Sequence, residues 1–217
     1  MKTRLLLSLV LGLTVGSVLA APLRVAKVNA PAYNCLFNTN CTITVNDTTA
    51  AFTTNLPPGS TNGSLTGFLQ SRTFQGQPGS PEAGLYGYEY RLVLNKLTGA
   101  SSVTIRSMTV DFSPYSSFTY QNQPNQQAWE VTSGGLGSTG PRTASVSGSK
   151  VTFRFFPPLV LSSASGQDAS TYFFGMISSV APPATANRWA TFEGLVTPAP
   201  GGAAVPFNFL AIQARAP

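Results

Sequence analysis

Apolar and polar side chains alternate along residues 84–97, and this period of two residues constrains the fold of the chain more than any other feature. The apolar side of the alternation holds Tyr86, Tyr88, Tyr90, Leu92 and Leu94. Such a pattern is typical of a β-strand that buries one face and exposes the other. We therefore expect Tyr88 and Leu92 to lie in a core, because this face would otherwise form a large apolar patch. Glu89 and Arg91, on the opposite side, are expected to be exposed.

The same period recurs in residues 103–112 and 150–155. In the first segment the phase changes between Ile105 and Met108, which predicts a β-bulge at this point. In the second segment, the pair Pro157-Pro158 is expected to end the strand. Shorter strand candidates are residues 42–45, 50–53, 68–74, 128–132, 172–177, 189–192 and 205–212.

Glycine and proline separate these segments, with 20 glycines and 17 prolines in the chain. No window beyond the N-terminal segment shows a helical repeat of about 3.6 residues. Many short strands with Gly/Pro-rich turns favour an all-β fold, namely a single antiparallel β-sandwich of jelly-roll-like or immunoglobulin-like topology. Residues 21–217 fit one such domain, since β-sandwiches of about 200 residues are common. A small outer-membrane β-barrel is the alternative, although the prolines and the scarcity of long strands argue against it.

Residues 1–20 have the three parts of a secretory signal peptide, which are a basic start, an uncharged apolar run and an end in small residues. Val18 and Ala20 are suitable residues for cleavage before Ala21. A transmembrane anchor is the alternative, but the run is short and is diluted by glycine and polar residues. We therefore expect an exported bacterial protein, secreted or at the cell surface, whose mature chain has no integral membrane span.

Charged side chains make up only 9% of the chain, so Ser, Thr, Asn and Gln must supply most of the polar surface. The hydrophobic fraction of 42% excludes disorder caused by an excess of charge. The formal net charge is +6, and the basic residues are scattered singly along the sequence. Nucleic-acid binding requires clustered basic residues, so we exclude it. A modest positive charge can favour a polysaccharide or a component of the cell envelope as partner, although we prefer the interpretation that it serves solubility alone.

Cys35 and Cys41 are the two cysteines of the chain. A close pair in an oxidising compartment is expected to form a disulfide that closes a short loop. A redox pair would favour the tighter Cys-x-x-Cys spacing, and a structural zinc site needs four ligands in a chain that contains no histidine. We therefore predict a Cys35–Cys41 disulfide, and neither a metal nor a cofactor.

Two short motifs match known sequence patterns, but the residues around them do not fit the structures that those patterns require. Residues 135–140 read G-x-G-x-x-G, but Pro141 follows them where a dinucleotide site would begin a helix. Residues 147–150 read S-x-x-K, but Gly148 and the flanking serines favour a turn over the helix of penicillin-recognising enzymes. We interpret both motifs as turns.

The absence of histidine limits the catalytic chemistry that the chain can support. Ser-His-Asp and Cys-His sites are excluded, which leaves paired carboxylates of the kind that hydrolyse glycosides. The acidic residues are Asp47, Glu82, Glu89, Asp111, Glu130, Asp168 and Glu193. Nothing in the sequence marks a close pair among them, so we assign no catalytic residue and predict no hydrolysis that depends on a single acid. A secreted, glycosidase-like hydrolase is the alternative function.

An amide-rich loop between two aromatic residues is the candidate ligand-binding segment. Tyr120 and Trp129 flank it, and Asn122 and Gln126 supply amide groups within it. Aromatic faces can stack on sugar rings, and amides can hydrogen-bond sugar hydroxyls. We prefer the other interpretation, in which the loop leaves a core tyrosine and returns through a core tryptophan.

Several segments of the chain resemble a group of secreted bacterial proteins of uncharacterised function: GLYGYEYRLVL, MTVDFSPYSSF, VTSGGLGSTGP, VTFRFFPP and STYFFGMISSVAPP. The resemblance covers residues 84–183 and implies an envelope or extracellular location without catalytic residues. Many members of this group carry a C-terminal sorting tail with a Pro-Glu-Pro motif, which is absent from this sequence. The sequence thus favours an exported, non-enzymatic extracellular or cell-surface module with a structural or ligand-binding role, a glycan being the candidate ligand.

Overall fold

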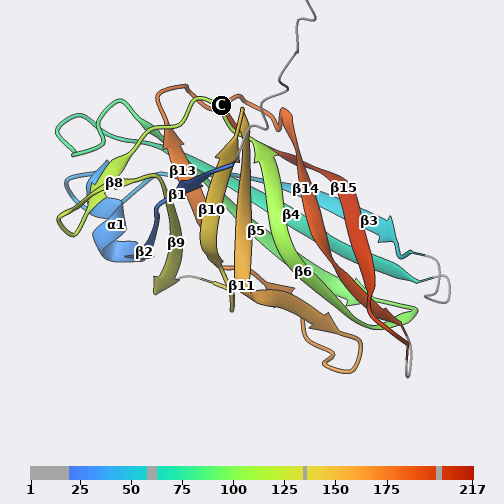
Figure 1. Cartoon of the computed structure of the whole chain (residues 1–217). Helices are drawn as coiled ribbons and strands as arrows, with labels where there is room; N and C mark the ends of the chain where they lie inside the picture. The colour runs from blue at the N-terminus through green and yellow to red at the C-terminus, as the bar shows by residue number, and fades with distance from the viewer. Residues whose placement is uncertain (1–19, 58–62, 134–135, 199–201) are drawn as a thin grey trace, which may run out of the picture.

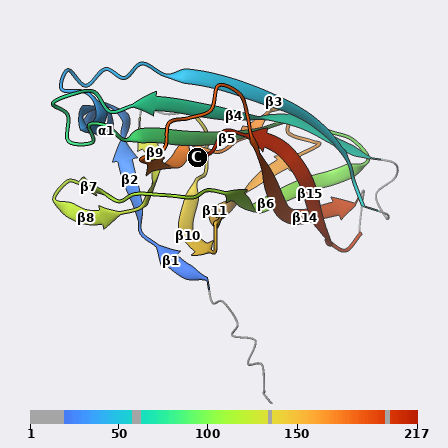
Figure 2. The same ribbon diagram turned by 90° about the horizontal axis from the view of Figure 1, so that it is seen from above.

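The computed structural model describes residues 20–57, 63–133, 136–198 and 202–217, with side chains omitted for residues 210–212. The signal peptide predicted at residues 1–20 therefore lies outside the described residues, except for Ala20. Strands dominate the described chain and form two large sheets that pack face to face as an all-β sandwich. Figure 2 shows the sheets as separate layers, with β3, β4 and β5 in one and β6, β11, β14 and β15 in the other.

Sheet A is six-stranded and antiparallel. Its strands, in spatial order, are β1 (Ala21–Leu23), β10 (Pro141–Ser147), β11 (Lys150–Ser162), β6 (Ala100–Asp111), β14 (Arg188–Pro198) and β15 (Val205–Ala214). This order brings strands from both halves of the chain together, as the colours of Figure 1 show.

Sheet B forms the second layer and is antiparallel except where β2 and β9 pair in parallel. Its main strands, in spatial order, are β2 (Val25–Asn29), β9 (Ala128–Ser133), β13 (Phe174–Ser178), β5 (Tyr86–Leu97), β4 (Ser64–Gln75) and β3 (Asn46–Asn55). The short strand β12 (Ala169–Ser170) pairs with β5 beside β13.

The core between the sheets confirms the alternation expected for residues 84–97. Tyr88, Tyr90, Leu92 and Leu94 of β5 are fully buried in it. Sheet A contributes inward-facing side chains from several strands, including Val103, Ile105, Met108, Phe153 and Phe192. Burial of these apolar surfaces supplies the main driving force for packing the two sheets together.

A second apolar cluster covers the outer face of sheet B at one end of the sandwich. It is formed under helix α1 (Ala30–Phe37) and the small hairpin of β7 (Phe118–Tyr120) and β8 (Gln123–Gln126), which lie beside β2 and β9 in Figure 1. No helix was expected here from the sequence. Tyr33 and Phe37 are one turn apart and are its buried residues, and Pro31 lies in its first turn. No helix in the described ranges is long and apolar enough to cross a bilayer.

The predicted bulge of β6 is confirmed, because the pairing with β14 shifts between Ile105 and Ser107 and leaves Arg106 unpaired. The prediction that Pro157-Pro158 would end the preceding strand was wrong. Strand β11 continues to Ser162 because its register with β6 shifts between Arg154 and Leu159, so the prolines occupy an irregular stretch. Residues 42–45 form no strand, whereas the other strand candidates overlap observed strands.

The S-x-x-K residues form the tight turn between β10 and β11, where Ser147 pairs with Lys150 and Gly148 has φ +60°. This geometry agrees with the turn interpretation. Of the glycine motif at residues 135–140, Gly135 lies outside the described residues, and the described part contains no helix.

Candidate functional site

A row of paired residues crosses the outer face of sheet B, the face that points away from sheet A. The register places Asp47 in β3 opposite Arg72 in β4, and Arg72 opposite Glu89 in β5. Glu89 is opposite Gly175 in β13, which pairs in turn with Trp129 in β9. Directly paired residues point to the same face of a sheet, so the side chains of this row lie in line across neighbouring strands.

Gly175 lies between Trp129 and Glu89 in the row and has no side chain to separate them. A Cβ atom at this position would overlap the carbonyl oxygen of Tyr88 in β5, so the close approach of the two strands requires glycine. The indole of Trp129 in β9 reaches across β13 to Glu89 in β5, and its Nε1–H donates a hydrogen bond to Oε1 of Glu89 at 3.0 Å. The buried indole N–H thereby has its acceptor.

Arg72 is fixed from two sides. Its Nε and Nη2 donate to Oδ1 and Oδ2 of Asp47 at 2.8 and 2.9 Å, which is a bidentate ion pair. The same guanidinium lies 4.2 Å from the ring centroid of Phe173. The hydrogen bond from Arg72 is the main cause that lowers the pKa of Asp47 from its usual value. The positive charge of the row is thus held in place and largely compensated.

Glu89 is the buried carboxyl group of the row, with 3% of the residue exposed. Burial raises its pKa to about 7, and the hydrogen bond from Trp129 and the charge of Arg72 offset only part of this rise. Such a group is present in both protonated and ionised forms near neutral pH. It can therefore donate as well as accept a hydrogen bond.

Tyr33 of α1 contributes a buried hydroxyl group near Glu89. Burial raises the pKa of Tyr33 well above its usual value, and the charge of Glu89 raises it further. Among the described residues, its Oη has no hydrogen-bond partner. Leaving a buried polar group without a partner is costly, so a hydrogen bond to this hydroxyl would be favourable.

Helix α1 is held over the sheet by aromatic packing and by the disulfide. Tyr33 and Phe37 contact Trp129 with ring centroids 4.9 and 6.5 Å apart, and Phe37 packs edge-on against Phe74 at 4.8 Å. The predicted disulfide between Cys35 and Cys41 is present and ties the helix to the loop that follows it.

A pocket of about 400 Å³ lies between α1 and the row. Its polar groups come from Tyr33, Asn34, Arg72 and Glu89. Its apolar lining comes from Ala30, Ile43, Val45, Val131, Leu136 and Phe173. This volume lies in the range of small-molecule sites, and apolar walls around a few convergent polar groups are typical of such sites.

The prediction that Glu89 would be exposed was wrong. Alternation identified the two faces of β5 correctly, but α1 and the strands around it cover the outer face as well. Arg91 is also partly buried at its guanidinium, where Nη2 donates to Oγ of Ser170 at 3.1 Å and Nε has no partner in the described chain. The pattern of a two-sided strand cannot show that a helix distant in sequence will cover its polar face.

The structure separates the residues of the proposed ligand-binding loop. Trp129 is fully buried, with its ring packed against Tyr33 and Phe118. Tyr120 is buried, and its Oη accepts a hydrogen bond from the backbone of Asn29 at 3.0 Å. Asn122 is exposed at the turn of the β7–β8 hairpin, whereas Gln126 is buried. These positions agree with the preferred interpretation of core rings around a surface loop.

The other acidic residues lie outside this pocket. Glu130 is buried and pairs with Lys27 at 3.5 Å, Asp168 accepts from Asn95 at 3.0 Å, and Glu193 accepts from Ser107 at 3.1 Å. Burial raises the pKa of Glu82 and of Glu130. Among the residues that the structure describes, Glu89 is the one carboxylate that lines the pocket.

The described part of the chain holds no cluster of three or more His, Cys, Asp or Glu side chains placed to bind a metal ion. Comparison of the chain with protein-family models, with curated proteins and with solved structures gave no match.

Proposed function

We propose that the chain is an exported, non-enzymatic β-sandwich module that binds a small ligand in the pocket beside Glu89. The observation that carries this proposal is the unused hydrogen-bonding capacity of the pocket. The Tyr33 hydroxyl is buried without a partner, and in the described chain the Glu89 carboxyl group is hydrogen-bonded only to Trp129. Export is supported by the signal-like N-terminal segment and by the disulfide, which suits an oxidising compartment.

The charges around the pocket favour an uncharged ligand with hydroxyl groups. Asp47 compensates Arg72, so little positive charge is left for an anion. Glu89, with a pKa of about 7, can donate to or accept from a hydroxyl group. A single sugar residue combines such hydroxyls with an apolar ring face that suits Phe173 and the aliphatic walls. The proposal therefore retains a glycan as the candidate ligand and places its recognition beside Glu89 instead of at Trp129.

The test is a binding screen of the purified exported chain against glucose, galactose, N-acetylglucosamine and small aromatic alcohols. Saturation-transfer NMR measures binding, and Tyr33→Phe and Glu89→Gln are the variants. Because the Tyr33 hydroxyl has no partner among the described residues, its removal is expected to leave stability unchanged or slightly raised. The same change should weaken binding of a hydroxylated probe by about five- to tenfold.

Tyr86→Phe is the matched control, because Tyr86 also lies on sheet B but does not line the pocket. It should leave binding unchanged. Equal affinity of the Tyr33→Phe and wild-type chains for every probe that binds would contradict a site at this pocket, and so would the absence of binding by any probe.

Hydrolysis by a carboxylate is the second candidate, and the pKa of Glu89 is the observation that favours it. A general acid works best with a pKa near the working pH, and Glu89 meets this condition. Glycoside hydrolysis uses a second carboxyl group nearby, and none lines the pocket in the described part of the chain. Turnover of polysaccharides or peptidoglycan that Glu89→Gln abolishes in a folded protein would establish the enzyme and overturn the binding module.

A further inference from the structure

Three neighbouring strands of sheet A lose their regular register at the same level of the sheet. In β10 the pairing with β11 shifts between Pro141 and Thr143, which leaves Arg142 unpaired. The pairing of β11 with β6 shifts between Arg154 and Leu159. These irregularities adjoin the bulge at Arg106 in β6 described above. Bulges redirect side chains and are frequent beside functional sites.

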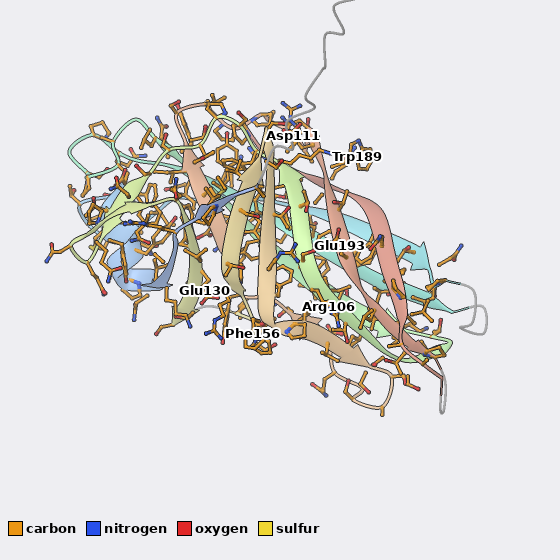
Figure 3. The ribbon with its side chains drawn as sticks, in the orientation of Figure 1. Arg106, Asp111, Glu130, Phe156, Trp189 and Glu193 are labelled. Atoms are coloured by element: carbon orange, nitrogen blue, oxygen red, sulfur yellow. A yellow bond between two sulfur atoms is a disulfide. The ribbon has the colours of Figure 1, made fainter. Side chains whose placement is uncertain are left out.

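These irregularities gather three arginines around one groove on the outer face of sheet A. The groove has a volume of about 550 Å³ and is lined by Arg106, Arg142 and Arg154 together with Phe155, Phe156 and Pro158, and by Thr143 at its edge. Phe156 is 65% exposed, although it belongs to a strand. Figure 3 shows Phe156 between Glu130 and Arg106 toward the lower edge of the molecule, with Asp111 and Trp189 at the upper edge.

None of the three arginines forms an ion pair within the described part of the chain. The ion pairs of the described chain are Lys27–Glu130 and Arg72–Asp47, and no described residue hydrogen-bonds to the guanidinium of Arg106, Arg142 or Arg154. The groove lining contains no acid. Glu193 in the neighbouring strand β14 faces Ser107 and accepts a hydrogen bond from its hydroxyl group at 3.1 Å.

The aromatic ring adds a second kind of contact to the groove. Arg142 lies over the ring of Phe156, with its guanidinium 5.1 Å from the ring centroid. This stacking holds a guanidinium beside an exposed ring without using its hydrogen-bond donors. The donors stay available to a carboxylate, sulfate or phosphate group, which arginine binds through paired hydrogen bonds.

We propose that this groove binds an anionic polysaccharide. A polymer of acidic sugars carries negative groups that match the three guanidinium groups and flat apolar ring faces that match Phe156. A groove with walls fits a narrow chain better than the flat surface of a bilayer. The site lies on the opposite sheet from the Glu89 pocket, so its occupancy does not depend on the function proposed for that pocket.

The test measures binding of the purified exported chain to polygalacturonate, with neutral dextran as the control polymer, by isothermal titration calorimetry at low and high salt. The wild-type chain should bind polygalacturonate and not dextran, with an affinity that falls as salt rises. The triple variant Arg106→Gln, Arg142→Gln, Arg154→Gln should bind at least about tenfold more weakly, because it loses charged hydrogen bonds. Phe156→Ala should lose about three- to tenfold through the missing ring contact.

A matched variant removes the same amount of charge elsewhere, through Arg24→Gln, Lys96→Gln and Lys150→Gln. These exposed residues do not line the groove, so this variant should bind almost as the wild type does. Equal losses in the two triple variants would show a general charge effect and overturn the proposal. Failure of the wild type to bind polygalacturonate would overturn it too, as would binding to phosphatidylglycerol vesicles without binding to the polymer.

Discussion

The two outer faces of the sandwich use arginine in opposite ways. On sheet B, Arg72 is held by Asp47 and Phe173 beneath a helix, and its charge is compensated before any ligand arrives. On sheet A, Arg142 stacks on an exposed ring, and neither it nor Arg154 has an acidic partner in the described chain. A covered face must neutralise its charges internally because burial of an unpaired charge is costly. An open face can leave charges to water and to a charged ligand.

The largest expected effect is the difference in unfolding free energy between alanine substitutions at the two tryptophans of the chain. Trp129 is fully buried under α1, whereas Trp189 in β14 is 56% exposed. Trp129→Ala should lower the free energy of unfolding by about 4 kcal/mol, because it leaves a cavity and removes the hydrogen bond to Glu89. Trp189→Ala should change it by less than about 0.5 kcal/mol. Urea denaturation of both variants measures the difference, and similar values would contradict the covered-face assignment.

The next effect concerns the pH dependence that Glu89 gives to stability. Its pKa is about 7 in the folded protein against 4.5 for the unperturbed group. Between these values the unfolded chain releases a proton that the folded chain keeps, so stability is full below pH 4.5 and is lost as pH rises to 7. Glu89→Gln should remove this loss, and should therefore be more stable than the wild type above pH 7 by on the order of 3 kcal/mol.

Thermal or urea unfolding measured from pH 4 to pH 8 tests this prediction. The two proteins should be nearly equal in stability at the acidic end, since Glu89 is protonated in both states there. Parallel pH profiles across the whole range would contradict a buried carboxyl group with a raised pKa. Glu82 and Glu130, whose pKa values are also raised, contribute to both profiles and cancel in the difference.

A smaller effect is expected from the disulfide that holds α1 beside the pocket. The bridge joins residues six positions apart, and short loops gain less from a cross-link than long ones. Replacing both cysteines by serine should therefore cost no more than about 2–3 kcal/mol. Non-reducing mass spectrometry of the purified wild type should show the bridged form. Two free thiols on that protein would contradict the assignment.

The smallest expected effect is the difference in stability between substitutions of one arginine on each face. Arg72→Gln removes the bidentate pair with Asp47 and should cost about 1–2 kcal/mol. Arg142→Gln should be nearly neutral, because no acid loses a partner and repulsion near Arg154 falls.

The pKa of Asp47 is lowered by Arg72 from 3.8, so its stabilising contribution is lost as pH falls below that value. The Arg72→Gln variant should lose less stability at acidic pH than the wild type does. Equal losses of unfolding free energy in the two arginine variants would contradict the difference between the faces.

The sequence alone determined the class of the fold and the phase of its central strand. Alternation in residues 84–97 placed Tyr88, Tyr90 and Leu92 on one buried face, because the side-chain period of a strand is independent of what it packs against. The shift of phase after Ile105 located the bulge of β6 for the same reason. The close spacing of Cys35 and Cys41, together with the signal-like N-terminal segment, predicted their bridge.

Only the tertiary structure decided which polar residues share a site. Asp47, Arg72 and Glu89 lie far apart along the chain and meet because the strand order of sheet B pairs them directly. The same holds for Arg106, Arg142 and Arg154, which looked like isolated charges until the register shifts of three strands brought them together. Local periodicity sets which face a side chain occupies, but the neighbours on that face are set by long-range pairing and by the helix that covers it.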